Sequence, residues 1–207
     1  MRKIVIAAAL AATSAVAIPV IAQMPTTAPG AKDPSRVTAG TYTVDSNHTQ
    51  VMWEVNHLGF NDYFGLFGNA TGTLTLDPAN PSAASVQIEI PINKVATSSD
   101  GLTKHLLGAD FFDAAKFPTA TFKSTSVAVD GDDARITGDL TIKGVTKQVV
   151  LDAEFAGAGN GPMNKKPTVG FHATTKVKRS DFGVSYGIPM VPDEVELKIS
   201  VAFEKSA

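Results

Sequence analysis

Alternation of apolar and polar side chains is the feature of this 207-residue sequence that most restricts its fold. Between Val195 and Phe203 every second residue is a large apolar one, and Glu, Lys, Ser and Ala stand between them. Similar runs begin at Val51, Leu74, Val86, Ile136, Val149 and Val169. Successive side chains of a β-strand point to opposite faces. The pattern therefore predicts half-buried antiparallel strands with one apolar and one solvated face.

Turn signals separate these runs at residues 77–81, 130–132, 143–144, 157–162 and 181–183. Together with the stretches 41–44 and 119–129, they indicate about eight or nine strands. An antiparallel meander is compatible with a sandwich or a barrel, but sequential hairpins favour the barrel because closure removes exposed edges. We therefore predict an all-β fold, an eight-stranded antiparallel up-and-down barrel. Such a barrel is just wide enough for side chains or one small ligand.

One segment, residues 98–108, departs from the alternation. Ser and Asp at its start are helix-capping residues, Leu102, Leu106 and Leu107 follow at helical spacing, and Gly108 provides a stop. This pattern predicts one short helix of about two turns.

The first 39 residues differ in composition from the rest of the chain. Met1-Arg2-Lys3 is basic, and Ile4 to Ala22 contains no charged residue, the layout of a secretory signal peptide cleaved before Gln23. An uncleaved anchor is the alternative, because 19 uncharged residues approach the ~20 that a membrane helix needs. Residues 23–39 are rich in Pro, Thr, Ala and Gly and predict a flexible linker. We therefore expect a signal peptide over 1–22, a linker over 23–39 and one folded domain over 40–207, with no membrane span after cleavage.

Charge and cysteine content exclude several classes of partner. Without Arg2 and Lys3 the 18 basic residues fall to 16, against 20 acidic ones, a net charge of −4. Such a surface has no electrostatic attraction for nucleic acid or anionic headgroups. The chain contains no cysteine, which excludes disulfides, thiolate metal sites and lipid attachment through cysteine.

The four histidines do not form a recognisable metal or catalytic motif. His48 and His57 are nine residues apart, an odd spacing that places them on opposite faces of a straight strand, and neither His-x-His nor His-Glu-x-x-His is present. His105 falls on the short helix and His172 on a polar strand face. Nucleophile and phosphate-loop motifs are likewise missing from the sequence. We therefore expect no metal and no enzyme activity; a metal-assisted enzyme at His48 and His57 is the alternative.

Aromatic residues gather in two segments outside the regular runs. Phe60, Tyr63, Phe64 and Phe67 lie in the glycine-rich stretch 59–68, which we interpret as a loop, and a second group surrounds the short helix. They are explained equally well as core filling or as the wall of a tunnel for an apolar chain. The candidate lining residues are Trp53, Val55, His57, Phe60, Phe64, Phe67, Leu106, Phe111, Phe112, Phe122 and Phe171. Arg179 could contact an anionic headgroup or form a turn-stabilising pair with a carboxylate.

Several motifs in order along the chain carry a family resemblance. They are the segments 42–49 (YTVDSNHT), 53–59 (WEVNHLG), 65–68 (GLFG), 105–113 (HLLGADFFD), 138–146 (GDLTIKGVT), 179–183 (RSDFG) and 193–195 (DEV). As a set these motifs resemble the YceI-like family of exported, lipocalin-like lipid-binding proteins. Thr49 stands where that family leads us to expect Ser.

The resemblance implies a lipocalin-like eight-stranded barrel with a short helix, located in the bacterial periplasm. It also implies a long amphiphile as ligand, such as a polyisoprenoid or an isoprenoid quinone, with no other cofactor and no catalytic residues. A stress-related protein that binds a partner through an exposed face is a further alternative, although the outward strand positions are mostly Thr, Lys, Glu and Asp. The oligomeric state is open, with a homodimer among the options.

Overall fold

A computed structural model describes residues 26–206 of the chain. The predicted signal peptide lies outside the described residues. The strands are β1 (Gly40–Val44), β2 (Gln50–His57), β3 (Asn61–Phe67), β4 (Thr71–Leu76), β5 (Ser85–Pro91), β6 (Val95–Ala96), β7 (Thr119–Asp130), β8 (Asp133–Ile142), β9 (Val145–Asn160), β10 (Pro167–Lys178) and β11 (Glu194–Lys205). The helices are α1 (Asp100–Leu106) and the 3₁₀ turns η1 (Pro34–Arg36), η2 (Pro81–Ala83), η3 (Ile92–Lys94) and η4 (Arg179–Phe182).

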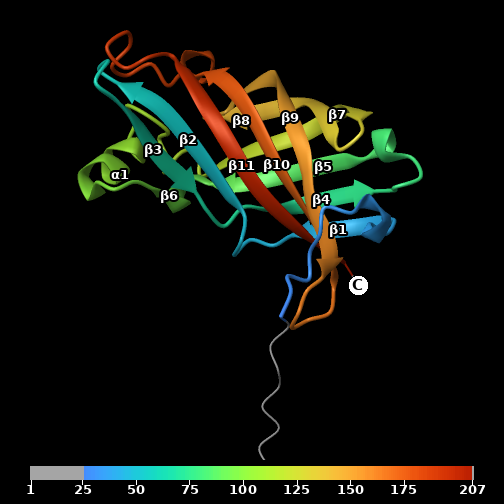
Figure 1. Ribbon diagram of the computed structural model, residues 1–207. Coiled ribbons are helices and arrows are strands. Elements are labelled where there is room, and N and C mark those ends of the chain that lie inside the picture. The colour runs from blue at the N-terminus through green and yellow to red at the C-terminus, as the bar shows by residue number, and fades with distance from the viewer. Residues whose placement is uncertain (1–25, 207) are drawn as a thin grey trace, which may run out of the picture.

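The strands form a closed antiparallel barrel (Figure 1). The order around the sheet is β1-β4-β5-β7-β8-β9-β10-β11, and pairing of β1 with β11 closes the ring of eight strands. The segments β2, β3 and β6 continue the ring at one end, because β2 follows β1 along the same edge of β11 and then pairs with β3. The predicted eight-stranded up-and-down barrel with one short helix is confirmed.

Burial follows the alternation from which the strands were predicted. On β10, for example, Val169, Ala173 and Val177 are buried, whereas Thr174 and Lys176 are exposed. Helix α1 begins where its capping signal indicated, since the Ser99 hydroxyl oxygen accepts a hydrogen bond from the Leu102 N–H at 3.3 Å. Within residues 26–206, no helix has the length and apolar character needed to cross a lipid bilayer.

The glycine-rich stretch 59–68 is not the loop that we expected, because most of it is strand β3. Gly65 pairs with Trp53 of β2, and the indole ring lies directly against the glycine. A Cβ atom at position 65 would stand 2.2 Å from the ring. This glycine therefore makes room for tryptophan inside a strand and does not mark a turn.

Residues 31–38 pack against the barrel, although the sequence predicted a flexible linker up to residue 39. Ala31 and Ala158 of β9 exchange two backbone hydrogen bonds of 3.1 and 2.9 Å. Gly157 and Gly159 leave space for this approach, since a Cβ atom at 159 would lie 2.2 Å from the Pro29 carbonyl oxygen. The Lys32 ammonium forms ion pairs with Glu154 and Asp132. Pairing with the edge of β9 that extends beyond β8 thus fixes a segment whose composition alone indicates flexibility.

Candidate functional site

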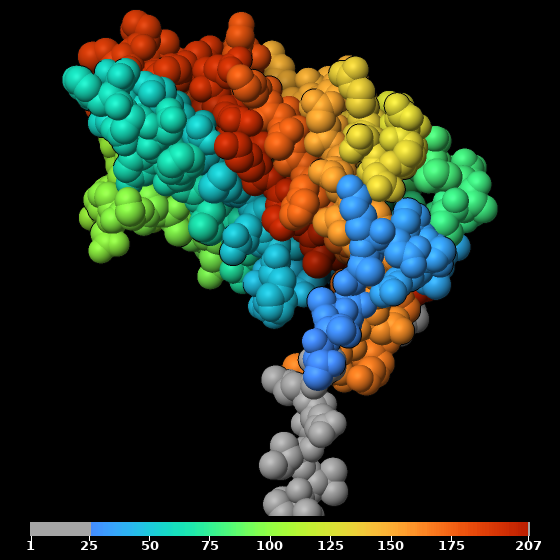
Figure 2. All heavy atoms as spheres, in the orientation of Figure 1, coloured from blue at the N-terminus to red at the C-terminus, as the bar shows by residue number. Residues whose placement is uncertain are grey.

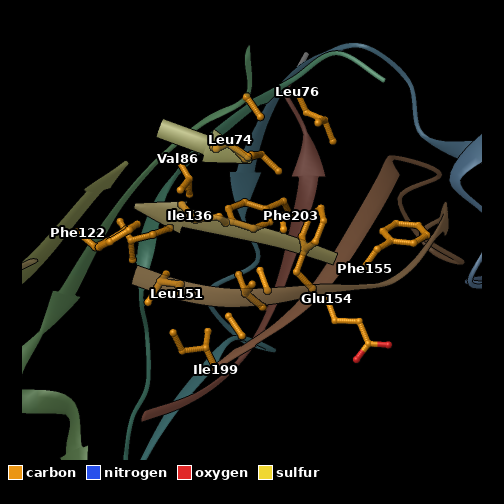
Figure 3. A pocket seen from close by; sticks show the side chains of 18 of the residues that line it. Leu74, Leu76, Val86, Phe122, Ile136, Leu151, Glu154, Phe155, Ile199 and Phe203 are labelled. Carbon is orange, nitrogen blue, oxygen red and sulfur yellow. The ribbon is translucent and has the colours of Figure 1, made fainter. Parts of the chain in front are cut away.

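The interior of the barrel is hollow and consists of two adjoining chambers. The mouth chamber, about 530 Å³, lies beside α1 and is walled by residues that include Trp53, Phe67 and Phe112. The distal chamber, about 410 Å³, lies farther along the barrel and is walled by residues that include Leu74, Phe155 and Phe203. Figure 3 shows the distal chamber, into which Leu74, Val86, Ile136 and Phe203 point, while the Glu154 carboxylate turns away. Both walls are almost entirely apolar.

Four residues line both chambers, so the two chambers meet at these side chains. They are Val51 of β2, Ile90 of β5, Leu140 of β8 and Leu197 of β11. All four are aliphatic; Val51 and Leu197 come from the paired strands β2 and β11, and Ile90 and Leu140 come from β5 and β8. We call these residues the junction.

Most residues that we expected to line the interior do so. Around the mouth chamber lie Trp53, Val55, His57, Phe67, Leu106, Phe111, Phe112 and Arg179. Phe122 and Phe171 line the distal chamber. The strands bring residues from distant parts of the sequence to one cavity.

The expectation for Phe60 and Phe64 is wrong. Phe60 stands at the tip of the β2–β3 turn and is 86% exposed, and Phe64 is 49% exposed on the outer face of β3. The inward positions of β3 are Tyr63, Gly65 and Phe67, because strand side chains alternate. The interpretation of 59–68 as a loop hid this alternation, and Tyr63, which was not among the candidate lining residues, lines the mouth chamber.

Three aromatic rings meet at the mouth chamber and form what we call the mouth cluster. His105 of α1 contacts Phe111 with ring centroids 4.9 Å apart, and Tyr186 lies 5.1 Å from His105 and 5.3 Å from Phe111. The His105 Nε2 also lies 3.0 Å from an Asp110 carboxylate oxygen. Tyr186 belongs to the loop 183–193 before β11, and no sequence motif had indicated its position.

Arg179 organises that loop. Its guanidinium donates four hydrogen bonds of 2.8–3.0 Å to the carbonyl oxygens of Val184, Tyr186, Val191 and Pro192. Four of its five N–H groups are thus occupied. Burial lowers the pKa of Arg179, and the nearby Asp193 carboxylate opposes this effect.

These contacts agree with a turn-stabilising role for Arg179, although its hydrogen bonds go to backbone carbonyls and the Asp193 carboxylate acts on it only through charge. With four of its N–H groups occupied, Arg179 has little capacity left for an anionic headgroup. The carboxylate of Asp193 instead accepts hydrogen bonds from the Ser180 hydroxyl (2.7 Å) and backbone N–H (2.8 Å). The hydroxyl bond, followed by the backbone bond, lowers the pKa of Asp193.

The structure does not bring His48 and His57 together. His48 lies in the turn before β2, with Nδ1 2.7 Å from an Asp45 carboxylate oxygen, while His57 is the last residue of β2. A strand of this length separates the two imidazoles by roughly 25 Å. Among residues 26–206, no group of three or more His, Cys, Asp or Glu side chains is arranged to hold a metal ion.

A closed antiparallel barrel with an apolar interior is the architecture of lipocalin-like proteins. Residues 42–203 match the model of the YceI-like domain, and the chain belongs to this family. Protein YceI of Escherichia coli O17:K52:H18 is 43% identical over 165 residues, which cover 79% of this chain and 86% of that protein.

Two solved structures have the same fold. BcnA of Burkholderia cenocepacia is 29% identical with a TM-score of 0.68, covering 77% of this chain and 98% of that protein. A polyisoprenoid-binding domain from Saccharophagus degradans, implicated in plant cell wall breakdown, has a TM-score of 0.57 at 15% identity, with coverage of 80% and 98%. At that identity the second likeness concerns the fold alone.

Proposed function

We propose that this protein binds one long, largely apolar molecule, such as a polyisoprenoid or an isoprenoid quinone, along the axis of its barrel, without chemical conversion. The observation that carries the proposal is the junction, where two apolar chambers that adjoin along the barrel share four aliphatic lining residues. A linear hydrocarbon chain fits such a cavity better than a compact ligand does.

Size and lining both favour a hydrocarbon chain. The chambers of about 530 and 410 Å³ each lie within the range of ordinary ligand sites. Apolar cavities hold water poorly, since water needs two to four polar partners. Each methylene transferred from water into the cavity contributes about 0.8 kcal/mol, so affinity rises with chain length until the cavity is full.

The polar end of the ligand would lie at the mouth chamber, and it would be neutral. Uncharged hydrogen-bonding side chains line this chamber, among them Asn61 and Tyr63. Arg179 lines the same chamber, but its donors are used by the loop carbonyls. An alcohol or a quinone head suits this setting better than a phosphate, which would need unoccupied donors.

Two further observations agree with the proposal. The polyisoprenoid-binding domain from Saccharophagus degradans has this fold. The basic N-terminus followed by the uncharged stretch 4–22 supports export through a cleaved signal peptide. We therefore include a periplasmic location in the proposal, where such a protein would store or carry its lipid.

Tryptophan fluorescence provides a direct test, because Trp53 is the sole tryptophan of the chain and lines the mouth chamber. Titration with an isoprenoid quinone is expected to quench this fluorescence saturably, at one quinone per protein. A polyprenol, which does not quench, is expected to compete and restore the signal. Native mass spectrometry of the same samples should show one added ligand mass. The absence of both saturable quenching and an added mass would refute the proposal.

A further inference from the structure

Two loops that border the mouth chamber carry exposed apolar side chains. At the tip of the β2–β3 turn, Leu58 is 43% exposed and Phe60 is 86% exposed. In the loop 183–193, Tyr186 is 53% exposed and Met190 is 69% exposed. We call these four side chains the apolar rim.

The apolar rim borders the cavity. From the β2–β3 turn, His57 and Asn61 line the mouth chamber, and from the other loop Tyr186 and Val191 do. The two loops also lie at the same corner of the molecule, where the cyan tip of β2 stands beside the red-orange loop that leads into β11 (Figures 1 and 2). A surface that covers both loops would therefore also cover the mouth.

Apart from His57, both loops are free of acidic and basic side chains. Residues 55–61 and 182–192 contain no Asp, Glu, Lys or Arg. A protein interface usually surrounds its apolar centre with polar and charged residues. An uncharged apolar rim with exposed aromatic side chains instead matches the boundary between headgroups and acyl chains, where amphipathic aromatic rings concentrate.

The β2–β3 tip carries apolar residues where the turn itself does not need them. Leu58 adopts a left-handed conformation with φ of 57°, followed by Gly59 with φ of 79°. Asn or Gly is the usual residue in this conformation, and leucine is disfavoured there. Phe60 also packs against little of the barrel, since it is 86% exposed, and Leu58 is 43% exposed. Their side chains project outward, which suits insertion into another phase.

We infer that the apolar rim docks on the surface of a neutral lipid bilayer and so places the mouth of the cavity against the membrane. Only the biological purpose of docking rests on the proposed function: a docked mouth would let an apolar chain pass between bilayer and barrel without crossing water. The attraction comes from apolar burial and not from charge, so it should be insensitive to salt.

Flotation with vesicles of neutral phosphatidylcholine tests the inference. The protein is used as recovered from the exporting cell, with its N-terminus determined by intact mass. Wild type is expected to float with the vesicles at both low and high salt. The double variant Phe60→Ser/Met190→Ser is expected to partition at least about tenfold more weakly. Met163→Ser is the matched control, because Met163 is 94% exposed in the β9–β10 turn at the other end of β11, and it should behave as wild type.

Three outcomes would overturn the inference. The wild type could stay off the vesicles, or the double variant could float as well as wild type. Light scattering could also show that wild type is a dimer and the double variant a monomer. Equal melting temperatures of the variants exclude misfolding. Quinone quenching of Trp53 in vesicle-free solution should be the same in wild type and the double variant. If the double variant no longer floats but its Trp53 is still quenched, the substitutions have removed membrane docking and not ligand binding. If Trp53 of the wild type is not quenched, the proposed ligand binding is refuted, but membrane docking is not.

Discussion

Replacing Ala153 with tryptophan is expected to weaken the binding of a long-tailed isoprenoid quinone by at least about 50-fold while leaving a short-tailed one almost unaffected. Ala153 is buried on β9 and lines only the distal chamber. An indole in that space excludes the end of a long tail. Loss of three buried methylenes, at about 0.8 kcal/mol each, gives this factor. Quenching of Trp53 reports the affinity, after correction for the signal of the added tryptophan.

The control for this change is Ala156→Trp on the outer face of the same strand. Ala156 is exposed and faces away from the cavity, so both quinones should bind as they do to wild type. The Ala153 variant should fold at least as stably as wild type because the new side chain occupies a void. An equal loss for short and long tails would contradict a ligand that runs from the mouth into the distal chamber.

Replacing Arg179 with leucine is expected to destabilise the fold by about 3 kcal/mol, because four carbonyl oxygens of the loop 183–193 lose their donor. For a chain of this size the melting temperature should fall by about 6–12 °C. Lysine at this position should recover little of the lost stability, since one ammonium group cannot reach carbonyls arranged around a planar guanidinium. Thermal unfolding followed by circular dichroism measures both variants.

Arg135→Leu serves as the matched control. Arg135 is exposed and forms one ion pair, with Asp152 at 3.6 Å, and exposed pairs contribute about 0–1 kcal/mol. If the melting temperature of Arg179→Leu is no lower than that of Arg135→Leu, the guanidinium does not organise the loop. Because Tyr186 belongs to that loop, the Arg179 variants should also open the mouth cluster and speed the release of quinone.

The barrel could be predicted because the residue pattern that indicates each strand lies within that strand. Each strand carries its own alternation, as in Val169, Ala173 and Val177, and short turns between strands leave few ways to connect them. Helix α1 was equally local, since its cap and its leucines lie within a few residues of one another. The same alternation placed Trp53 and Val55 on the interior.

The features that the sequence did not reveal depend on contacts between distant residues. Gly65 indicates a loop until Trp53, twelve positions earlier, is seen to cover it. Residues 31–38 have the composition of a linker, but contacts with distant residues fix them: Ala31 pairs with Ala158 of β9, and Thr38 forms hydrogen bonds with Tyr42 and Lys205. Arg179 suggested a carboxylate partner, whereas its partners are backbone carbonyls, which every residue possesses and no side-chain pattern indicates. Tyr186 reaches the mouth cluster only because Arg179 holds its loop.

Whether a single ligand occupies both chambers is tested most directly by the electron density inside the barrel in a crystal of the quinone-loaded protein. We expect one unbroken tube of density from the mouth cluster past Val51, Ile90, Leu140 and Leu197 into the distal chamber, with the quinone ring at the mouth. Density that stops at the junction, or a barrel whose interior is closed by its own side chains, would contradict this account.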